Sequence, residues 1–353
     1  MKKSALALAV LAALFLNNSV NAQSRVQVYG LVDAGVDAVN HSGANDGGMV
    51  RVISGGKNTS RWGLRGSEDL GDGLKAVFNL EGGILMDTGA TDGPLFKRQA
   101  NVGLEGAFGR VVIGRSFTTT YELVGKFDPL GYASRYSWAT TGSATGPSRY
   151  GMTTAFDNLV KYTGHGGGFT YGASIGLGEQ AGNAADGRKY AVGGSWLSKG
   201  LGLMASYEQI NGSTVAATGN RDKSTAFHLG ASYQTGRWRY TAAMRGYKLQ
   251  ASRAATADVR GDTYWGGITY NVQAWTLTGA VYHVNTKELP AAKDADPTML
   301  VARAMYALSK RTDLYMVAAH AKADHGQLVG LSRDDPGFGS TQNGFTAGIQ
   351  HRF

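Results

Sequence analysis

The sequence contains no cysteine, only 6 prolines and few charged residues, which make up 17% of the chain. The absence of cysteine excludes a disulfide scaffold, a thiolate metal site and a thiol nucleophile. After the N-terminal segment, no stretch reaches the roughly 18 apolar residues that a transmembrane helix needs. Glycine and tyrosine are abundant instead, with 52 and 17 residues, and 42% of the chain is apolar. This composition argues against a disordered chain and favours strands over helices.

The N-terminal 22 residues have the features of a secretory signal. Two lysines follow Met1, residues 5–16 are apolar, and the small residue Ala22 ends a cleavage-site pattern. We predict cleavage after Ala22, which leaves residues 23–353 as one domain. A membrane anchor is the alternative reading, but the apolar run is too short for one. An exported chain without apolar helices can still enter a membrane as a closed β-barrel, because closure leaves no backbone group unpaired in lipid.

Alternation of apolar and polar residues predicts strands along the whole chain. The last segment is the clearest, because Phe345, Ala347, Ile349 and Phe353 share one face with His351, and small or polar residues lie opposite. The first segment, 26–37, and residues 75–81 alternate in the same way. Strands that cross a membrane as a barrel show this two-residue period, with the apolar face toward lipid.

The connections between these runs are of two kinds, and the two kinds alternate. Seven are short and mostly rich in glycine, near residues 71–73, 106–109, 164–168, 198–200, 234–236, 271–273 and 309–313. Eight are longer, near residues 40–58, 88–95, 116–156, 179–187, 211–223, 250–260, 287–297 and 323–342. Fifteen connections predict an all-β fold, a sixteen-stranded antiparallel transmembrane β-barrel. A soluble sandwich also has closely spaced strands, but we would not expect such regular alternation of its loops.

Several motifs resemble those of one known family. They are Gln27–Gly35, Ser60–Gly71, Arg98–Leu104 followed by Gly109–Arg115, Tyr306–Tyr315 and Gly348–Phe353. Through these motifs the whole mature chain resembles the general trimeric porins of Gram-negative outer membranes, particularly the β-proteobacterial type.

The resemblance implies how the protein is organised. Porins of this family are homotrimers in which each barrel has its own pore, and they sit among outer-membrane lipids and lipopolysaccharide. The third long loop, here residues 116–156, folds into the barrel and narrows it. The terminal aromatic residue, here Phe353, is the signal that the outer-membrane assembly machinery reads.

Candidate basic residues of the pore wall come from the alternation. Arg61 and Arg65 lie opposite Trp62 and Leu64. Lys161 lies between apolar residues of the other face. All three are therefore predicted to point into the lumen, because an arginine or lysine facing lipid at mid-membrane costs roughly 2–4 kcal/mol.

Two further arginines are candidates through the resemblance. Strict alternation places Arg98 on the lipid side with Val102 and Leu104, whereas the resemblance places it in the constriction, which needs a bulge or a rim position. Arg149 is a candidate from the end of the third loop. The family often has an arginine shortly before its Asp-Asn pair, and here Ala155 stands close to that place.

The acidic side of the pore is predicted to come from four carboxylates. Glu122 and Asp128 lie in the third loop, and Asp33 and Glu81 face the lumen from neighbouring strands. The balance favours basic residues, and a ring of arginines between low-dielectric walls concentrates anions. We therefore expect a water-filled channel for passive diffusion of small hydrophilic solutes and ions that prefers anions. A channel specific for one class of anion, such as organic acids or phosphate, would have the same wall residues and stays open as the alternative.

Other function classes find little support in the sequence. An enzyme on a barrel needs a Ser-His-acid arrangement or a metal motif, and no His-x-x-His, His-Glu-x-x-His or Gly-x-Ser-x-Gly pattern occurs. We predict no enzyme activity, no cofactor and no metal site. The formal net charge is +9, but lysines and arginines are scattered without a basic run, so no nucleic-acid partner is expected.

Overall fold

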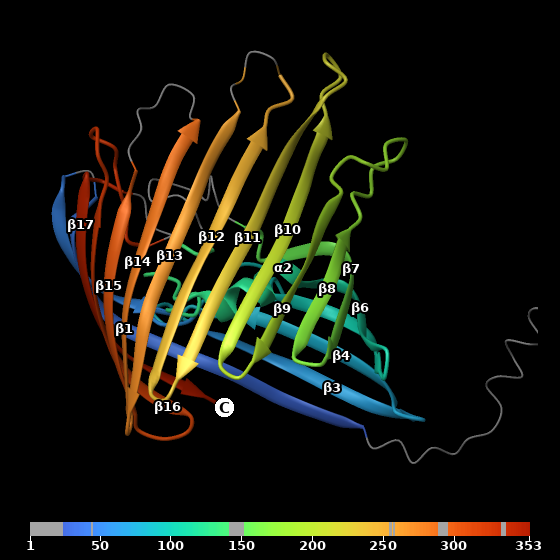
Figure 1. Ribbon diagram of the computed structural model, residues 1–353, viewed down its shortest axis with the longest axis horizontal. Helices are drawn as coiled ribbons and strands as arrows, with labels where there is room; N and C mark the ends of the chain where they lie inside the picture. The colour runs from blue at the N-terminus through green and yellow to red at the C-terminus, as the bar shows by residue number, and fades with distance from the viewer. Residues whose placement is uncertain are drawn as a thin grey trace, which may run out of the picture.

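The computed structural model describes residues 24–43, 45–140, 152–253, 256, 258–288, 296–332 and 337–353. Each strand pairs with the next in antiparallel fashion, and the last strand pairs with the first, so the sheet closes into a barrel (Figure 1). The elements are β1 (Arg25–Ser42), β2 (Gly47–Ser54), β3 (Arg61–Gly71), β4 (Leu74–Gly83), β5 (Gln99–Gly106), β6 (Gly109–Phe117), α2 (Thr119–Val124), a 3-10 turn η1 (Gly125–Phe127), β7 (Ala155–Gly166), β8 (Phe169–Gly176), β9 (Lys189–Ser198), β10 (Leu201–Thr214), β11 (Arg221–Thr235), β12 (Trp238–Gln250), β13 (Val259–Val272), β14 (Trp275–Glu288), β15 (Thr298–Ala307), β16 (Thr312–Lys322) and β17 (Thr341–Arg352).

The second position of the barrel is occupied by two strand segments. β3 pairs with the first half of β1, where Leu31 lies opposite Arg61, and β2 pairs with the second half, where Ala34 lies opposite Ser54. Residues 55–60 interrupt this strand. The segments therefore fill sixteen positions, which confirms the predicted sixteen-stranded antiparallel barrel. The first long connection predicted over residues 40–58 was wrong in extent, because residues 47–54 form β2. The glycines at both ends of this segment hid its strand pattern.

The short and long connections lie at opposite ends of the barrel (Figure 1). All seven predicted short connections are confirmed as turns of two to four residues. In the turn between β3 and β4, both Asp72 and Gly73 have positive φ, +52° and +75°, as a tight hairpin with two central residues requires. We call this end the turn side and the other the loop side. In outer-membrane barrels the short turns face the periplasm.

Side chains alternate between the outside and the lumen as the sequence predicts. Val28, Val102 and Leu300 point outward with more than half of their surface exposed, which suits a lipid environment. Inward residues are of two kinds: polar ones such as Asp33 of β1 and Gln350 of β17 are fully buried, and apolar ones such as Met299 of β15 belong to the core that the third loop covers. No helix among the described residues is long and apolar enough to cross a membrane.

The connection between β6 and β7 folds into the barrel, as predicted for the third long loop. We call residues 118–154 the third loop; its residues 118–140 and 152–154 are described. Figure 1 shows α2 inside the ring of strands, and α2 contacts β9 and β10. Thr118 caps α2 by accepting a hydrogen bond from the Tyr121 amide at 3.0 Å. The loop therefore divides the lumen, because its apolar side chains pack against one part of the wall.

Small residues on the inner wall make room for the third loop. A Cβ atom at Gly193 of β9 would lie 2.8 Å from the Leu123 side chain, and one at Gly267 of β13 would lie 2.5 Å from Pro129. Real Cβ atoms do not approach so closely, so larger residues here would force the loop or its side chains to shift. The loop covers the wall from β8 round to β17 and reaches Asp37 of β1. The open lumen runs along β1 and β3–β8.

Candidate pore constriction

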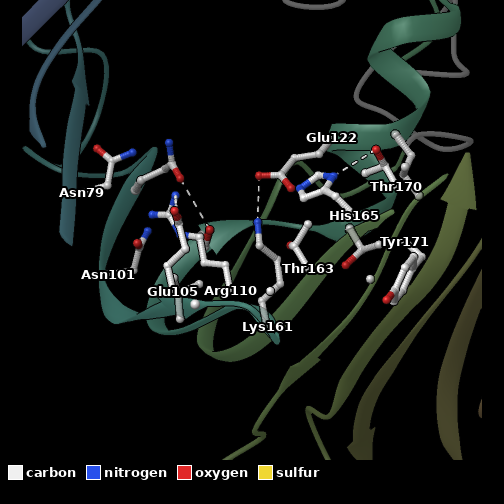
Figure 2. A pocket seen from close by; sticks show the side chains of 18 of the residues that line it. Asn79, Asn101, Glu105, Arg110, Glu122, Lys161, Thr163, His165, Thr170 and Tyr171 are labelled. Atoms are coloured by element: carbon white, nitrogen blue, oxygen red, sulfur yellow. Dashed lines mark hydrogen bonds and ion pairs between the residues drawn. The ribbon is translucent and has the colours of Figure 1, made fainter. Parts of the chain in front are cut away.

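Three hollows follow the open side of the lumen. The loop-side cavity has a volume of about 610 Å³ and is lined by Arg61, Glu81, Arg98 and Tyr121 among others. The turn-side cavity is about 750 Å³ and includes Glu122 and Lys161 (Figure 2). A third, the rim cavity of about 530 Å³, continues from it at the turn side and shares some lining residues with it.

Arg61 and Arg98 line the loop-side cavity, but their charges are balanced differently. The Nε of Arg98 lies 2.7 Å from Oε1 of Glu81, and the Tyr29 hydroxyl donates to Oε2 of the same carboxylate at 2.7 Å. Glu81 is therefore fully engaged. Arg61 donates only to the Thr59 carbonyl, at 3.3 Å, and has no carboxylate partner among the described residues. Two guanidinium groups thus share the charge of one carboxylate, which leaves a net positive charge where the third loop narrows the lumen.

Arg98 reaches the lumen because it precedes a strand rather than lying in one. β5 begins at Gln99, so the alternation that places Val102 outward does not extend to Arg98. Its amide donates to the Glu81 carbonyl at 3.2 Å, and its guanidinium lies 5.1 Å from the centroid of the Phe117 ring. The structure places this side chain on the inner side and not toward lipid.

Arg65 and Lys161 lie away from Arg61. Arg65 lines the rim cavity, where its Nε and Nη2 donate to Oε1 of Gln27 at 3.1 and 2.9 Å. Lys161 is buried in the wall, with its Nζ 2.7 Å from Oε1 of Glu122 and 3.0 Å from the Phe117 carbonyl oxygen. Figure 2 shows this pair at the turn-side cavity, where Lys161 ties the start of the third loop to β7.

The remaining predicted acids are buried and line none of the three cavities. The Asp33 carboxylate accepts hydrogen bonds from the Tyr315 hydroxyl at 2.6 Å and from Nε2 of the Gln350 side chain at 2.9 Å. Asp128 accepts from the Tyr282 hydroxyl at 2.5 Å and from the Tyr132 amide at 2.6 Å. Each carboxylate therefore holds parts of the chain together rather than meeting the open lumen.

One predicted basic residue cannot be placed. Arg149 lies outside the described residues.

Comparison with known proteins decides the family. Residues 7–326 match the family model of Gram-negative porins. The chain belongs to the Gram-negative porin family. It is 33% identical to outer membrane porin protein 32 of Delftia acidovorans over the full length of both chains, and 34% identical to an outer membrane porin protein of Bordetella pertussis over 66% of each. The protein is therefore an outer-membrane porin, and porins are channels rather than enzymes.

Solved porin structures share the fold. An anion-selective porin from Comamonas acidovorans superposes with a TM-score of 0.82 at 28% identity, over 94% of this chain and all of the other. The trimer form of OmpT from Vibrio cholerae has a TM-score of 0.70 at 17% identity, over 94% of this chain and 99% of the other, a likeness of fold alone.

More charged side chains line the cavities of this porin than the sequence predicted. Ten basic side chains line the three cavities: Arg25, Arg61, Arg65, Lys75, Lys97, Arg98, Arg110, Arg115, Lys126 and Lys161. Four acidic side chains line them: Glu81, Asp92, Glu105 and Glu122. The inward position on a strand is the sequence signal that could have found several of them. Arg115 was hidden by a register shift between Gly114 and Ser116.

Other inward arginines of the porin hold the third loop and do not line these cavities. Arg245 of β12 is fully buried and donates to the Ala139 carbonyl at 2.6 Å. Arg303 of β15 donates to the Leu130 carbonyl at 3.0 Å. Alternation predicts that such residues point inward, but it does not separate a side chain that meets water from one that meets the loop.

Proposed function

We propose that this porin is a passive channel for small hydrophilic solutes that prefers anions, with Arg61 as the main selectivity residue and Arg98 beside it. The observation that carries the proposal is the guanidinium of Arg61 in the loop-side cavity, which forms no ion pair among the described residues. The excess of basic over acidic lining residues supports a preference for anions along the rest of the path as well. The relative from Comamonas acidovorans, which is described as anion-selective, adds support.

The physical reason is local enrichment of counter-ions. A charge between low-dielectric walls acts over a distance comparable with the width of a narrow pore, because the screening length is about 8 Å at physiological salt. Selectivity is therefore set where the lumen is narrowest. In this proposal Glu81 and Glu122 form the acidic side, and Asp33 and Asp128 are left out because they are buried in hydrogen-bond networks.

The test is the reversal potential of the purified porin in a planar bilayer under a KCl gradient. A potential that favours chloride supports the proposal. A potential that favours potassium would leave the channel intact but refute the assignment of the dominant charge to Arg61. Folded protein that conducts no current would refute the channel function.

We also propose that the chain forms a homotrimer in contact with outer-membrane lipids and lipopolysaccharide. The outer faces of β1, β2 and β17 carry exposed apolar side chains, such as Val36, Val50 and Phe345, next to one another in the barrel. Conductance steps in groups of three and a trimer mass by light scattering in detergent support it. A monomer mass for fully conducting protein contradicts it.

Export and assembly complete the proposal. Residues 1–22, which lie outside the described residues, act as a signal removed after Ala22. Phe353 pairs with Gly30 through two backbone hydrogen bonds of 3.1 Å, and its ring remains partly exposed on the outer surface, where assembly machinery could reach it. Removal of Phe353 should lower the amount of folded porin in the outer membrane, and mass spectrometry of the mature N-terminus tests the cleavage.

A further inference from the structure

The rim cavity at the turn side gathers basic residues far from Arg61. Four basic side chains line it, Arg25, Arg65, Lys75 and Arg110, against one acidic side chain, Glu105. Arg110 and Glu105 also line the turn-side cavity, where Figure 2 shows them on the same part of the wall. The two cavities are therefore continuous, and the basic cluster faces the path that a solute takes.

The positive charges of this cluster are only partly cancelled. Arg65 is held by neutral groups, because it donates to Gln27 and its guanidinium lies 4.7 Å from the centroid of the Tyr29 ring. Arg110 approaches Glu105 only to 4.0 Å, the outer range of an ion pair. The cluster therefore keeps donors available for a bound anion.

Two residues at the edge of the cluster have no carboxylate contact among the described residues. They are Arg25, the first residue of β1, and Lys75, at the start of β4. In the sheet register Lys75 lies between Asp69 of β3 and Glu105 of β5, the acidic residue already counted. The Asp69 carboxylate accepts a hydrogen bond from the Gly71 amide at 2.9 Å and is absent from the cavity lining. Even with Asp69 counted, the cluster is basic.

The cluster acts independently of the loop-side cavity. Arg61 and Arg65 lie on the same face of β3 and four residues apart, a separation of about 13 Å along the strand. This exceeds the screening length of about 8 Å at physiological salt. An ion at Arg65 therefore feels the rim cluster much more than it feels Arg61.

We propose that the rim cavity is a second binding site of the pore, selective for small multivalent oxyanions such as phosphates. The proposal rests on the proposed anion preference of the channel. Guanidinium groups match the geometry of oxyanions through paired hydrogen bonds, and a multivalent anion can contact two of these side chains at once. Chloride cannot do so and passes through. Binding must remain weak enough for release, as in any conducting pore with several sites.

The experiment is sided block of chloride current by tripolyphosphate. A single trimer in a planar bilayer conducts in KCl, and tripolyphosphate is added first to one chamber and then, in a second recording, to the other. We expect half-block at a concentration about tenfold lower from one chamber, because only one mouth carries the cluster. In the double variant R25Q/K75Q this ratio should fall to about twofold or less, and the assembled channel should still conduct chloride.

The control is a second double variant, K199Q/R237Q, which removes two positive charges from short turns at the same end, outside the three cavities. It should keep the wild-type ratio. If R25Q/K75Q fails to assemble, K75Q alone should lower the ratio partway. Equal block from both chambers in the wild type, or an unchanged ratio in R25Q/K75Q, overturns the rim site. A wild-type channel that prefers potassium refutes the proposed function instead, so the two failures are distinguishable.

Discussion

Replacing Arg61 by glutamine removes the one guanidinium of the loop-side cavity that has no carboxylate partner among the described residues. The substitution shortens the side chain but keeps a donor for the Thr59 carbonyl. The ion pair between Arg98 and Glu81 does not involve Arg61 and is left in place. The expected change is therefore electrostatic, a loss of preference for chloride over potassium, with the barrel intact.

The size of the effect follows from the distance of an ion to the guanidinium. Two unit charges about 4 Å apart interact by about 1 kcal/mol in bulk water, and screening at physiological salt reduces this to about 0.6 kcal/mol. An anion gains this energy and a cation loses it, so the ratio of their populations changes by about 1.2 kcal/mol, or about eightfold. Ions spread over the pore cross-section, so the permeability ratio should fall about three- to eightfold. At 1 M salt, where the screening length is about 3 Å, the same reasoning gives about twofold.

The assay is the reversal potential of wild type and R61Q under KCl gradients of equal ratio, at low and at high mean salt. R237Q, which removes a positive charge from a short turn, is the matched control and should match the wild type. An unchanged reversal potential in R61Q removes Arg61 from the selectivity mechanism. An effect that is as large at 1 M as at 0.1 M refutes the electrostatic origin even if the sign is right.

Three further predictions follow from the described contacts. E81Q leaves the guanidinium of Arg98 without its carboxylate, so the reversal potential should move further toward chloride, in the direction opposite to R61Q; no shift would mean that the pair does not face the path. R245A removes a buried donor to the third loop, so we expect a lower midpoint of thermal unfolding and a larger, noisier single-channel conductance; unchanged conductance would show that other anchors suffice. The Thr214 amide donates a hydrogen bond to the Asp186 carboxylate at 2.8 Å and thereby lowers the pKa of that carboxyl. The stabilisation from this hydrogen bond is complete above the ordinary aspartate pKa of 3.8 and is lost as the pH falls through the lowered pKa. Hydrogen exchange of the Thr214 amide should therefore be faster in D186N than in wild type at pH 5, and the ratio of the two rates should approach one as the pH falls through the lowered pKa.

The barrel was predictable because one physical rule governs every strand. Lipid lies outside and water or polar groups lie inside, so the period of two appears wherever a strand crosses, as in residues 345–353. The short turns were predictable for a similar reason, since positions with positive φ favour glycine, as at Gly73. The rule fails where a strand is short and flanked by glycine, which is why β2 was missed, and where the register shifts, as at Arg115.

The site was less predictable because a side chain that points inward either lines the open lumen or is buried in contacts with other parts of the chain. Asp33 and Glu81 have the same parity and both point inward, but Asp33 meets a network from β16 and β17, while Glu81 lines the loop-side cavity. The difference depends on the path of the third loop and on the break at residues 55–60. Neither is set by alternation, because both are decided by contacts between segments far apart in the sequence.

The way the third loop is held has a consequence for variation of this protein. Arg245, Arg303 and Trp265 of the wall donate to backbone carbonyls of the loop, at Ala139, Leu130 and Phe127. Every amino acid supplies the same carbonyl, so these anchors do not depend on which side chains the loop carries. Loop residues that face passing solutes can therefore change by mutation while the hydrogen bonds that hold the loop to the wall are kept. The range of permeant solutes can change in this way without any change in the barrel.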